Sequence, residues 1–266
     1  MLCPYLQVAI VKEKLRATFE RKGGSVREAQ QVMAVTDPGD NGGGYYEAKL
    51  IRLAFHDCLK YTDGTGGCDG CLNWHNMGMK FTDQKQNKYP DVGPPNPGDN
   101  NGLRNTVEVL EAIYTVPTYP RRSTKLATSL KDSGKSRADL WSLAGITAVE
   151  YGIETNNRKC QNPGSVKGCH HLQGEPGCEV HLNSSIPFRT GRADCIPTDP
   201  DRPYIASKEE VHPNPVGDGT ETVQFFKEQF EFSGQETVAI MGAHTMGKFF
   251  FKNSLFRFRY WEVPYT

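Results

Sequence analysis

Apolar residues in this chain recur at helical spacing in several separate segments, and no segment sustains the alternation that a half-buried strand requires. The clearest run, Ala138 to Tyr151, has the apolar, β-poor composition of a buried helix. Long stretches rich in Gly, Pro, Asn and Asp separate these segments and favour turns and loops. Nothing repeats at a fixed period. The sequence therefore predicts a mainly α fold with long loops.

The apolar spacing predicts helices over residues 5–21, 47–59, 103–113, 138–151 and 222–230. A further helix is predicted to begin near Ser233, because Ser233 and Glu236 have the spacing of a capping box ahead of the apolar residues 238–241. Residues 152–211 show little periodicity and contain four cysteines and many Pro and Gly residues. We expect this region to be dominated by loops.

The charge balance excludes several classes of partner. The 266 residues contain 31 Lys and Arg and 31 Asp and Glu, so no overall field attracts nucleic acid or an anionic membrane. No apolar stretch approaches the roughly 20 residues that span a bilayer. We expect a globular protein without nucleic acid or membrane partners, whose binding comes from a local site.

The chain has an even number of cysteines, several of them in Gly-rich loops: Cys3, Cys58, Cys68, Cys71, Cys160, Cys169, Cys178 and Cys195. Oxidising compartments favour such cysteines, because disulfides there hold irregular backbone. Asn183 begins an N-glycosylation sequon. We therefore expect a secreted or lumenal protein whose signal peptide is absent from this chain; a cytosolic protein with free thiols is the alternative.

Arg52 and His56 lie four residues apart in the predicted helix 47–59, so their side chains share one face and can act on one ligand. A neutral imidazole can move a proton between the two oxygens of a peroxide. A guanidinium, which never deprotonates, can stabilise the negative charge that develops on the departing oxygen. The pair is the kind that peroxide cleavage requires.

Two runs carry a resemblance to a known family. Residues 51–58 (IRLAFHDC) resemble the distal signature, and residues 239–248 (AIMGAHTMGK) the proximal signature, of the haem peroxidase superfamily of plants, fungi and bacteria. Residues 139–149 and 186–194 are similar to runs of its cytochrome c peroxidase branch. The resemblance implies a two-lobed helical fold, haem b as cofactor, and hydrogen peroxide and a small reducing substrate as reactants.

The resemblance also implies roles for individual residues. His56 is the acid-base, Arg52 stabilises charge and Phe55 packs over the porphyrin. His244 is the axial iron ligand, and Lys248 pairs with a haem propionate.

Asn100 matches the Asn that accepts a hydrogen bond from the distal histidine, which fixes the imidazole tautomer. Asp99 is the competing register. An N-cap role for Asn100, ahead of the helix that starts at Leu103, is the other interpretation.

Four residues fall where secreted members of the superfamily bind calcium through oxygen ligands: Asp57, the carbonyl of Gly67, Asp69 and Thr245. Cys71 stands where those members usually have Ser, which removes one oxygen. Cys58 and Cys68 match the cysteines of a disulfide in those members. The resemblance thus implies one disulfide and a possible calcium site.

In lobe terms, the resemblance implies a distal lobe over residues 1–155 and a partial proximal lobe over residues 156–266. The family holds its proximal histidine with a buried Asp several tens of residues later. We expect that this Asp is absent from the chain, that the proximal lobe is incomplete and that activity is impaired.

Two alternatives remain: a secreted scaffold without catalysis, and a binding module stabilised by zinc. Six residues could bind such a zinc ion: Cys160, Cys169, His170, His171, Cys178 and His181. Their spacing lacks the usual paired motif, so disulfides are the favoured interpretation.

Overall fold

The computed structural model describes residues 4–19, 46–64, 66–72, 100, 103–117, 128–161, 180, 183–197, 213–214 and 217–245. In this part of the chain the regular structure is helical and contains no strand. The prediction of a mainly α fold is confirmed. No helix within these ranges is both long and apolar enough to cross a membrane.

The helices follow one another in the order that the apolar spacing predicts. They are α1 (Pro4–Phe19), α3 (Tyr46–Cys58), α4 (Arg104–Thr115), α5 (Arg137–Gln161), α6 (Gly219–Phe230), α7 (Gly234–Met241) and the 3₁₀ helix η2 (Gly242–Thr245). Each of the six predicted helices is present, with ends that differ by a few residues except at α5.

Helix α5 extends ten residues beyond its predicted end, to Gln161 instead of Tyr151. Contacts outside the local sequence account for the extension. Arg16 of α1 pairs with Glu154 at 2.6 Å, and Cys160 in the last turn is buried. The helix also runs through residue 155, so the division into two lobes at that residue stays a prediction.

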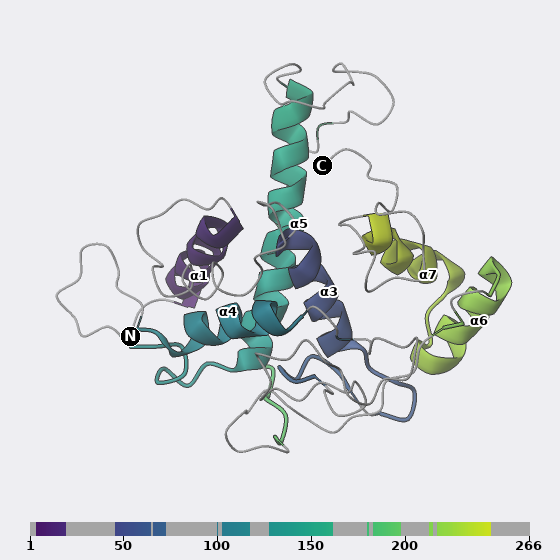
Figure 1. Cartoon of the computed structure of the whole chain (residues 1–266), viewed down its shortest axis with the longest axis horizontal. Helices are drawn as coiled ribbons and strands as arrows, with labels where there is room; N and C mark the ends of the chain where they lie inside the picture. The colour runs from purple at the N-terminus through teal and green to yellow at the C-terminus, as the bar shows by residue number, and fades with distance from the viewer. Residues whose placement is uncertain are drawn as a thin grey trace, which may run out of the picture.

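Helix α5 is the centre of the fold, with α3 packed along one side and α1 and α4 on the other (Figure 1). The crossing of α3 and α5 depends on Gly145, because a Cβ at that position would lie 2.5 Å from the Cβ of Ala54. Trp141 is completely buried in the same apolar core. This close crossing fixes the position of α3, which carries Arg52 and His56.

Helix α1 is joined to α5 by charged side chains. Lys12 Nζ lies 2.7 Å from Glu150 Oε1, and the Glu150 side chain is only 3% exposed. Glu150 also accepts a hydrogen bond from the backbone N–H of Ile186 at 2.9 Å. One buried carboxylate therefore connects α1, α5 and the segment 183–197.

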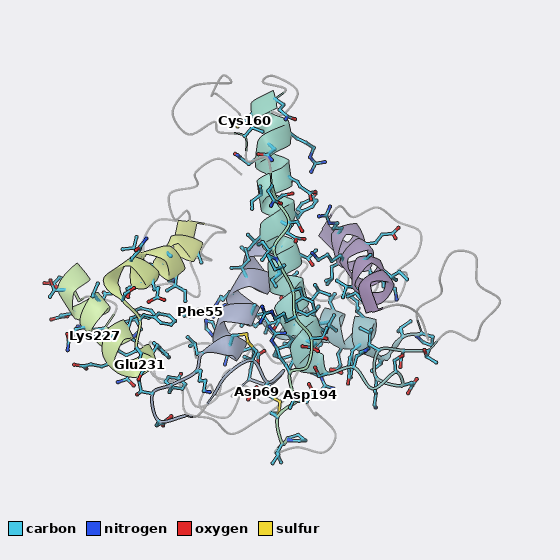
Figure 2. All side chains as sticks on the ribbon, turned by 180° about the vertical axis from the view of Figure 1, so that it is seen from behind. Phe55, Asp69, Cys160, Asp194, Lys227 and Glu231 are labelled. Carbon is cyan, nitrogen blue, oxygen red and sulfur yellow. A yellow bond between two sulfur atoms is a disulfide. The ribbon has the colours of Figure 1, made fainter. Side chains whose placement is uncertain are left out.

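The segment 183–197 has no regular secondary structure and runs along α5 (Figure 2). Its later residues are hydrogen-bonded to the start of α5. The backbone N–H of Gly191 donates to Asp139 Oδ2 at 2.8 Å, and Asp194 Oδ1 accepts from the backbone N–H of Ala138 at 2.9 Å. The expectation of loops over residues 152–211 is confirmed for this segment and is wrong for residues 152–161, which are helical.

Helices α6 and α7 form a second, smaller apolar cluster with the chain that follows α3. Phe226 and Phe230 of α6 are buried together with Leu59 and Tyr61. The predicted capping box at Ser233 is confirmed, since both of its hydrogen bonds are present. This arrangement leads α7 and η2 toward the side of α3 that faces away from α5.

Candidate functional site

The strongest contact in the candidate site joins His56 to Asn100. His56 Nδ1 lies 2.7 Å from Asn100 Oδ1, and Asn100 is completely buried. An amide oxygen can only accept, so Nδ1 carries the hydrogen and Nε2 keeps its lone pair. The structure therefore holds His56 in the tautomer that a proton acceptor needs.

Asn100 belongs to the turn that leads into α4. Its backbone oxygen accepts a hydrogen bond from the N–H of Leu103 at 3.0 Å, and Leu103 is the N-cap residue of α4. No side chain caps this helix. The Asn100 side chain is therefore directed to His56 and does not serve as an N-cap. The competing residue, Asp99, lies outside the described residues.

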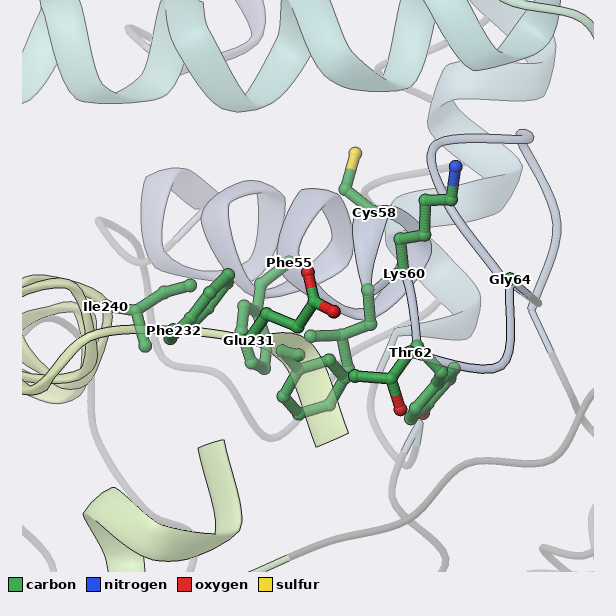
Figure 3. A pocket seen from close by; sticks show the side chains of 11 residues that line it. Phe55, Cys58, Lys60, Thr62, Gly64, Glu231, Phe232 and Ile240 are labelled. Atoms are coloured by element: carbon green, nitrogen blue, oxygen red, sulfur yellow. The ribbon is translucent and has the colours of Figure 1, made fainter. Parts of the chain in front are cut away.

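Arg52 and Phe55 are both partly buried on α3, at the spacing that places them near His56. The rings of Phe55 and His56 meet edge to face, with centroids 5.7 Å apart. The side chain of Phe55 extends from α3 toward Phe232 and Ile240, whereas Cys58 points to the opposite side of the helix (Figure 3). The predicted pair and its aromatic neighbour are therefore together on one helix.

A cavity of about 710 Å³ opens beside Phe55. Its walls are mainly apolar and come from α3 and the loop 59–64 that follows it, from the α6–α7 connection with Phe230 and Phe232, and from Ile240 in α7. The volume is within the roughly 300–1,000 Å³ typical of cofactor pockets. Neither His56 nor His244 lines it, but Phe55, whose ring contacts His56, does.

His244 lies in η2, directly after α7, and its side chain is exposed. Surrounding protein atoms nevertheless desolvate the imidazole, which lowers its pKa below the usual 6.5, and the positive charge of Arg52 lowers the pKa further. A hydrogen bond to the backbone of Met241 opposes this shift. The neutral imidazole, which is the form that binds a metal, is therefore favoured.

These residues fit a haem group. The cavity offers apolar walls for a flat macrocycle, and a neutral imidazole stands on the 3₁₀ helix that packs against α3. The Met241 backbone occupies one ring nitrogen of His244, in the way that metal-bound histidines usually engage a carbonyl. Thr245 lies in η2 beside His244, and Lys248 lies outside the described residues.

Two of the four residues expected at a calcium site, Asp57 and Asp69, accept hydrogen bonds from the loop itself. Asp57 Oδ1 accepts hydrogen bonds from three backbone N–H groups, and Asp69 Oδ1 accepts one from Cys71. Gly67 lies in the same loop, with φ +103°. Within the described ranges, no three His, Cys, Asp or Glu residues come together as metal ligands would. The loop's own N–H groups therefore engage one oxygen of Asp57 and one oxygen of Asp69.

Two disulfides join the chain around this loop. Cys58–Cys68 is the pair that the resemblance implied, while Cys71–Cys195 was not foreseen, because connectivity cannot be read from cysteine spacing. Cys160 is also disulfide-bonded, with its partner outside the described residues. This bond makes Cys160 unsuitable as a zinc ligand. The other members of the suggested zinc cluster lie outside the described residues.

Comparison with known proteins identifies the family of this chain and two relatives. The peroxidase family profile matches residues 28–263. A putative mitochondrial cytochrome c peroxidase of Yarrowia lipolytica is 26% identical over 230 residues, which cover 84% of this chain and 55% of that protein. Mitochondrial cytochrome c peroxidase of Candida glabrata is 27% identical over 225 residues, 83% of this chain and 43% of that protein.

The chain therefore belongs to the peroxidase family and is a member of the haem peroxidase superfamily. It spans about half the length of these two curated relatives.

The expectation of a secreted or lumenal protein is wrong. Both relatives are mitochondrial proteins. An even cysteine count and a glycosylation sequon are compatible with an oxidising compartment, but neither is a targeting signal. The disulfides observed here are compatible with other locations.

Proposed function

We propose that this chain is a haem-dependent peroxidase that reduces hydrogen peroxide with electrons from a reducing substrate. The hydrogen bond between His56 and Asn100, on a helix that also carries Arg52, is the observation that supports the proposal most strongly. Haem b, when bound, supplies the iron that takes up the oxidising equivalents of peroxide. His244 and Phe55 are the residues of this chain that would hold it.

His56 acts as the acid-base in this proposal. Because Asn100 fixes the hydrogen on Nδ1, the Nε2 lone pair is available to take the proton from one peroxide oxygen. The resulting imidazolium then returns that proton to the other oxygen, which leaves as water. The His56 side chain ends the cycle in the tautomer in which it started.

Arg52 acts on charge in this proposal and does not transfer a proton. It lies one helical turn before His56, so both side chains reach the same ligand. Its guanidinium stays protonated throughout and donates fixed hydrogen bonds to the oxygen that gains negative charge as the O–O bond breaks. The two residues thus divide proton movement and charge stabilisation between them.

His244 serves as the axial ligand in this proposal. Desolvation and the Arg52 charge keep its imidazole neutral, and the contact with the Met241 backbone restrains the ring. Lys248 remains a prediction as the partner of a haem propionate.

The proposal also covers the reducing substrate and the cellular compartment. The names of the two relatives favour cytochrome c as electron donor and mitochondria as the compartment. A small organic reductant is the alternative donor. Peroxide-driven oxidation of ferrocytochrome c, measured beside oxidation of a simple phenol, distinguishes the two.

The direct test is reconstitution. We expect the purified chain to bind one equivalent of haem and to consume hydrogen peroxide when a donor is present. His244→Ala is expected to abolish tight haem binding, whereas Gln235→Ala, an exposed change on α7, is expected to leave it intact. Stoichiometric haem uptake by His244→Ala would overturn the ligand assignment, and absence of turnover by the haem-loaded chain would overturn the proposed reaction.

A further inference from the structure

The residue that directly follows His56 is a buried carboxylate with an unusual set of donors. Asp57 is 0% exposed. Its Oδ1 accepts hydrogen bonds from the backbone N–H groups of Asp69 at 3.2 Å, Gly70 at 2.9 Å and Cys71 at 3.2 Å. Hydrogen bonds to an ionised acceptor are stronger than neutral ones. Asp57 therefore fastens three consecutive loop residues to the last turn of α3.

The loop is shaped around this carboxylate. Successive N–H groups that point at one oxygen form an anion-binding concavity, and here the chain fills it with its own side chain. Gly70 makes the turn possible with φ +70°. A Cβ on Gly70 would lie 2.7 Å from the backbone nitrogen of Ala138, so the loop is pressed against the start of α5.

A disulfide closes the loop from the other side. Cys71 is bonded to Cys195, and the backbone N–H of Cys195 donates to the carbonyl oxygen of Asp69 at 2.8 Å. Figure 2 shows Asp69 and Asp194 close to the base of α5, beside a disulfide drawn in yellow. The bond connects positions 124 residues apart and secures the segment 183–197 to the loop.

The same arrangement disfavours a cation at Asp57 Oδ1. The three N–H dipoles direct their positive ends at this oxygen, which stabilises the carboxylate and repels a second positive charge in the same shell. Asp69 Oδ1 is engaged by the N–H of Cys71, and the Cys71 sulfur is part of a disulfide. Asp57 Oδ2 is a buried oxygen that none of these hydrogen bonds reaches. It is one oxygen, whereas a calcium ion needs six to eight oxygen ligands.

We propose that the Asp57 carboxylate and the Cys71–Cys195 disulfide, and not a bound calcium ion, hold residues 66–72 on the end of α3. The carboxylate binds the loop amides, and the disulfide supplies the second attachment. Because His56 precedes Asp57 on the same helical turn, this clamp also fixes the end of the helix that carries the proposed acid-base. The inference does not depend on haem binding or turnover.

The test compares two aspartates in the full chain by thermal unfolding. Calcium chloride and excess EGTA are each expected to leave the Tm of the unmodified chain unchanged. Asp57→Asn is expected to lower Tm by roughly 4–8 °C, because it weakens three charge-assisted bonds at once. Asp69→Asn, the matched control, loses part of one bond and is expected to lower Tm by no more than about 2 °C.

The opposite pattern would overturn the proposal: calcium raises the Tm of the unmodified chain, and Asp57→Asn and Asp69→Asn abolish that rise equally. A measurement on the unmodified chain does not depend on whether Asp57→Asn folds. Elemental analysis after dialysis against calcium is expected to find no stoichiometric calcium, and one equivalent per chain would contradict the proposal. Neither readout involves haem or peroxide, so both stand apart from the proposed catalytic function.

Discussion

The two sides of the candidate site differ in how completely the chain itself supports them. On the distal side, formed by α1, α3, α4, α5 and residues 183–197, His56 is hydrogen-bonded to a buried Asn100 and is followed by a buried Asp57. On the proximal side, formed by α6, α7 and η2, His244 is exposed, and Val238 of α7 is 71% exposed.

The two sides therefore differ in how far protein contacts alone set the state of the catalytic imidazole that each is proposed to hold. Protein contacts set the tautomer of the distal imidazole before any cofactor arrives. The proximal imidazole is kept neutral, but the side chains around it are open to solvent. We infer that the distal side is preorganised by protein contacts, whereas the proximal side is more open to solvent. The following predictions test this contrast.

The largest effect is expected from His56→Leu. Removal of the acid-base should lower the rate of peroxide consumption by the haem-loaded chain about 10²–10⁴-fold. Haem uptake, followed by absorbance titration, should remain, because His56 is not the proposed iron ligand. A rate within a few-fold of the unmodified chain would break the distal half of the comparison.

The next effect concerns the buried carboxylate that holds α1 on the distal side. Glu150→Ala leaves Lys12 and the N–H of Ile186 without their acceptor, and should cost about 2–4 kcal/mol of unfolding free energy. Glu154→Ala is the control, since Glu154 and Arg16 are each about one third exposed and such pairs contribute about 0–1 kcal/mol. Urea unfolding measures both, and equal losses would contradict the assigned role of burial.

A pair of glycines compares the packing of the two sides. Gly145→Ala places a Cβ against Ala54 and should destabilise the chain by about 1–2 kcal/mol, even after the gain in helix propensity. Gly242→Ala meets no atom within 4 Å at a backbone φ of −56°, so it should be neutral or stabilise by up to about 1 kcal/mol. If Gly242→Ala destabilised the chain and Gly145→Ala did not, the proximal side would be the more tightly packed one, which contradicts the account.

The smallest effect is a pKa change that links the two sides. Because the folded chain lowers the pKa of His244 below 6.5, the unfolded chain binds its proton first as the pH falls. His244 therefore has no effect on stability well above pH 6.5 and makes the folded state less stable as the pH drops below that value. NMR titration of the histidine should show this lowered pKa.

Arg52→Gln should raise the pKa of His244, because the Arg52 charge is one of its causes, but desolvation should keep the value below 6.5. Arg16→Gln on α1 provides a matched loss of charge that should leave His244 unaffected. A His244 pKa that does not respond to Arg52→Gln would show that the two sides are not electrostatically coupled.

Local sequence patterns were sufficient to predict most of the helices and to place Arg52 and His56 on one helix. The capping box at Ser233 and the Arg52 and His56 spacing depend on residues a few positions apart, which a sequence displays directly. The position of Asn100 came from resemblance, and the structure now gives it a hydrogen bond. The catalytic roles of these residues stay predictions until they are measured.

Other features depend on tertiary contacts that no local pattern reveals. In the last ten residues of α5, Glu154 pairs with Arg16, far away in the sequence, and Cys160 is buried. The Cys71–Cys195 bond joins positions 124 residues apart, and Asp57 finds its donors only after the loop has folded back. The predicted compartment was wrong for a related reason. Cysteine content indicates whether disulfides can form, and it does not determine where the protein is targeted.

The most direct test of distal preorganisation is ¹⁵N NMR of the histidine rings in the chain without haem. We predict that His56 is a single tautomer with the hydrogen on Nδ1 and a bare Nε2, and that Asn100→Ala removes this preference. A His56 that carries its hydrogen on Nε2, or that averages between both forms in the unmodified chain, would contradict the claim that the protein alone prepares the distal site.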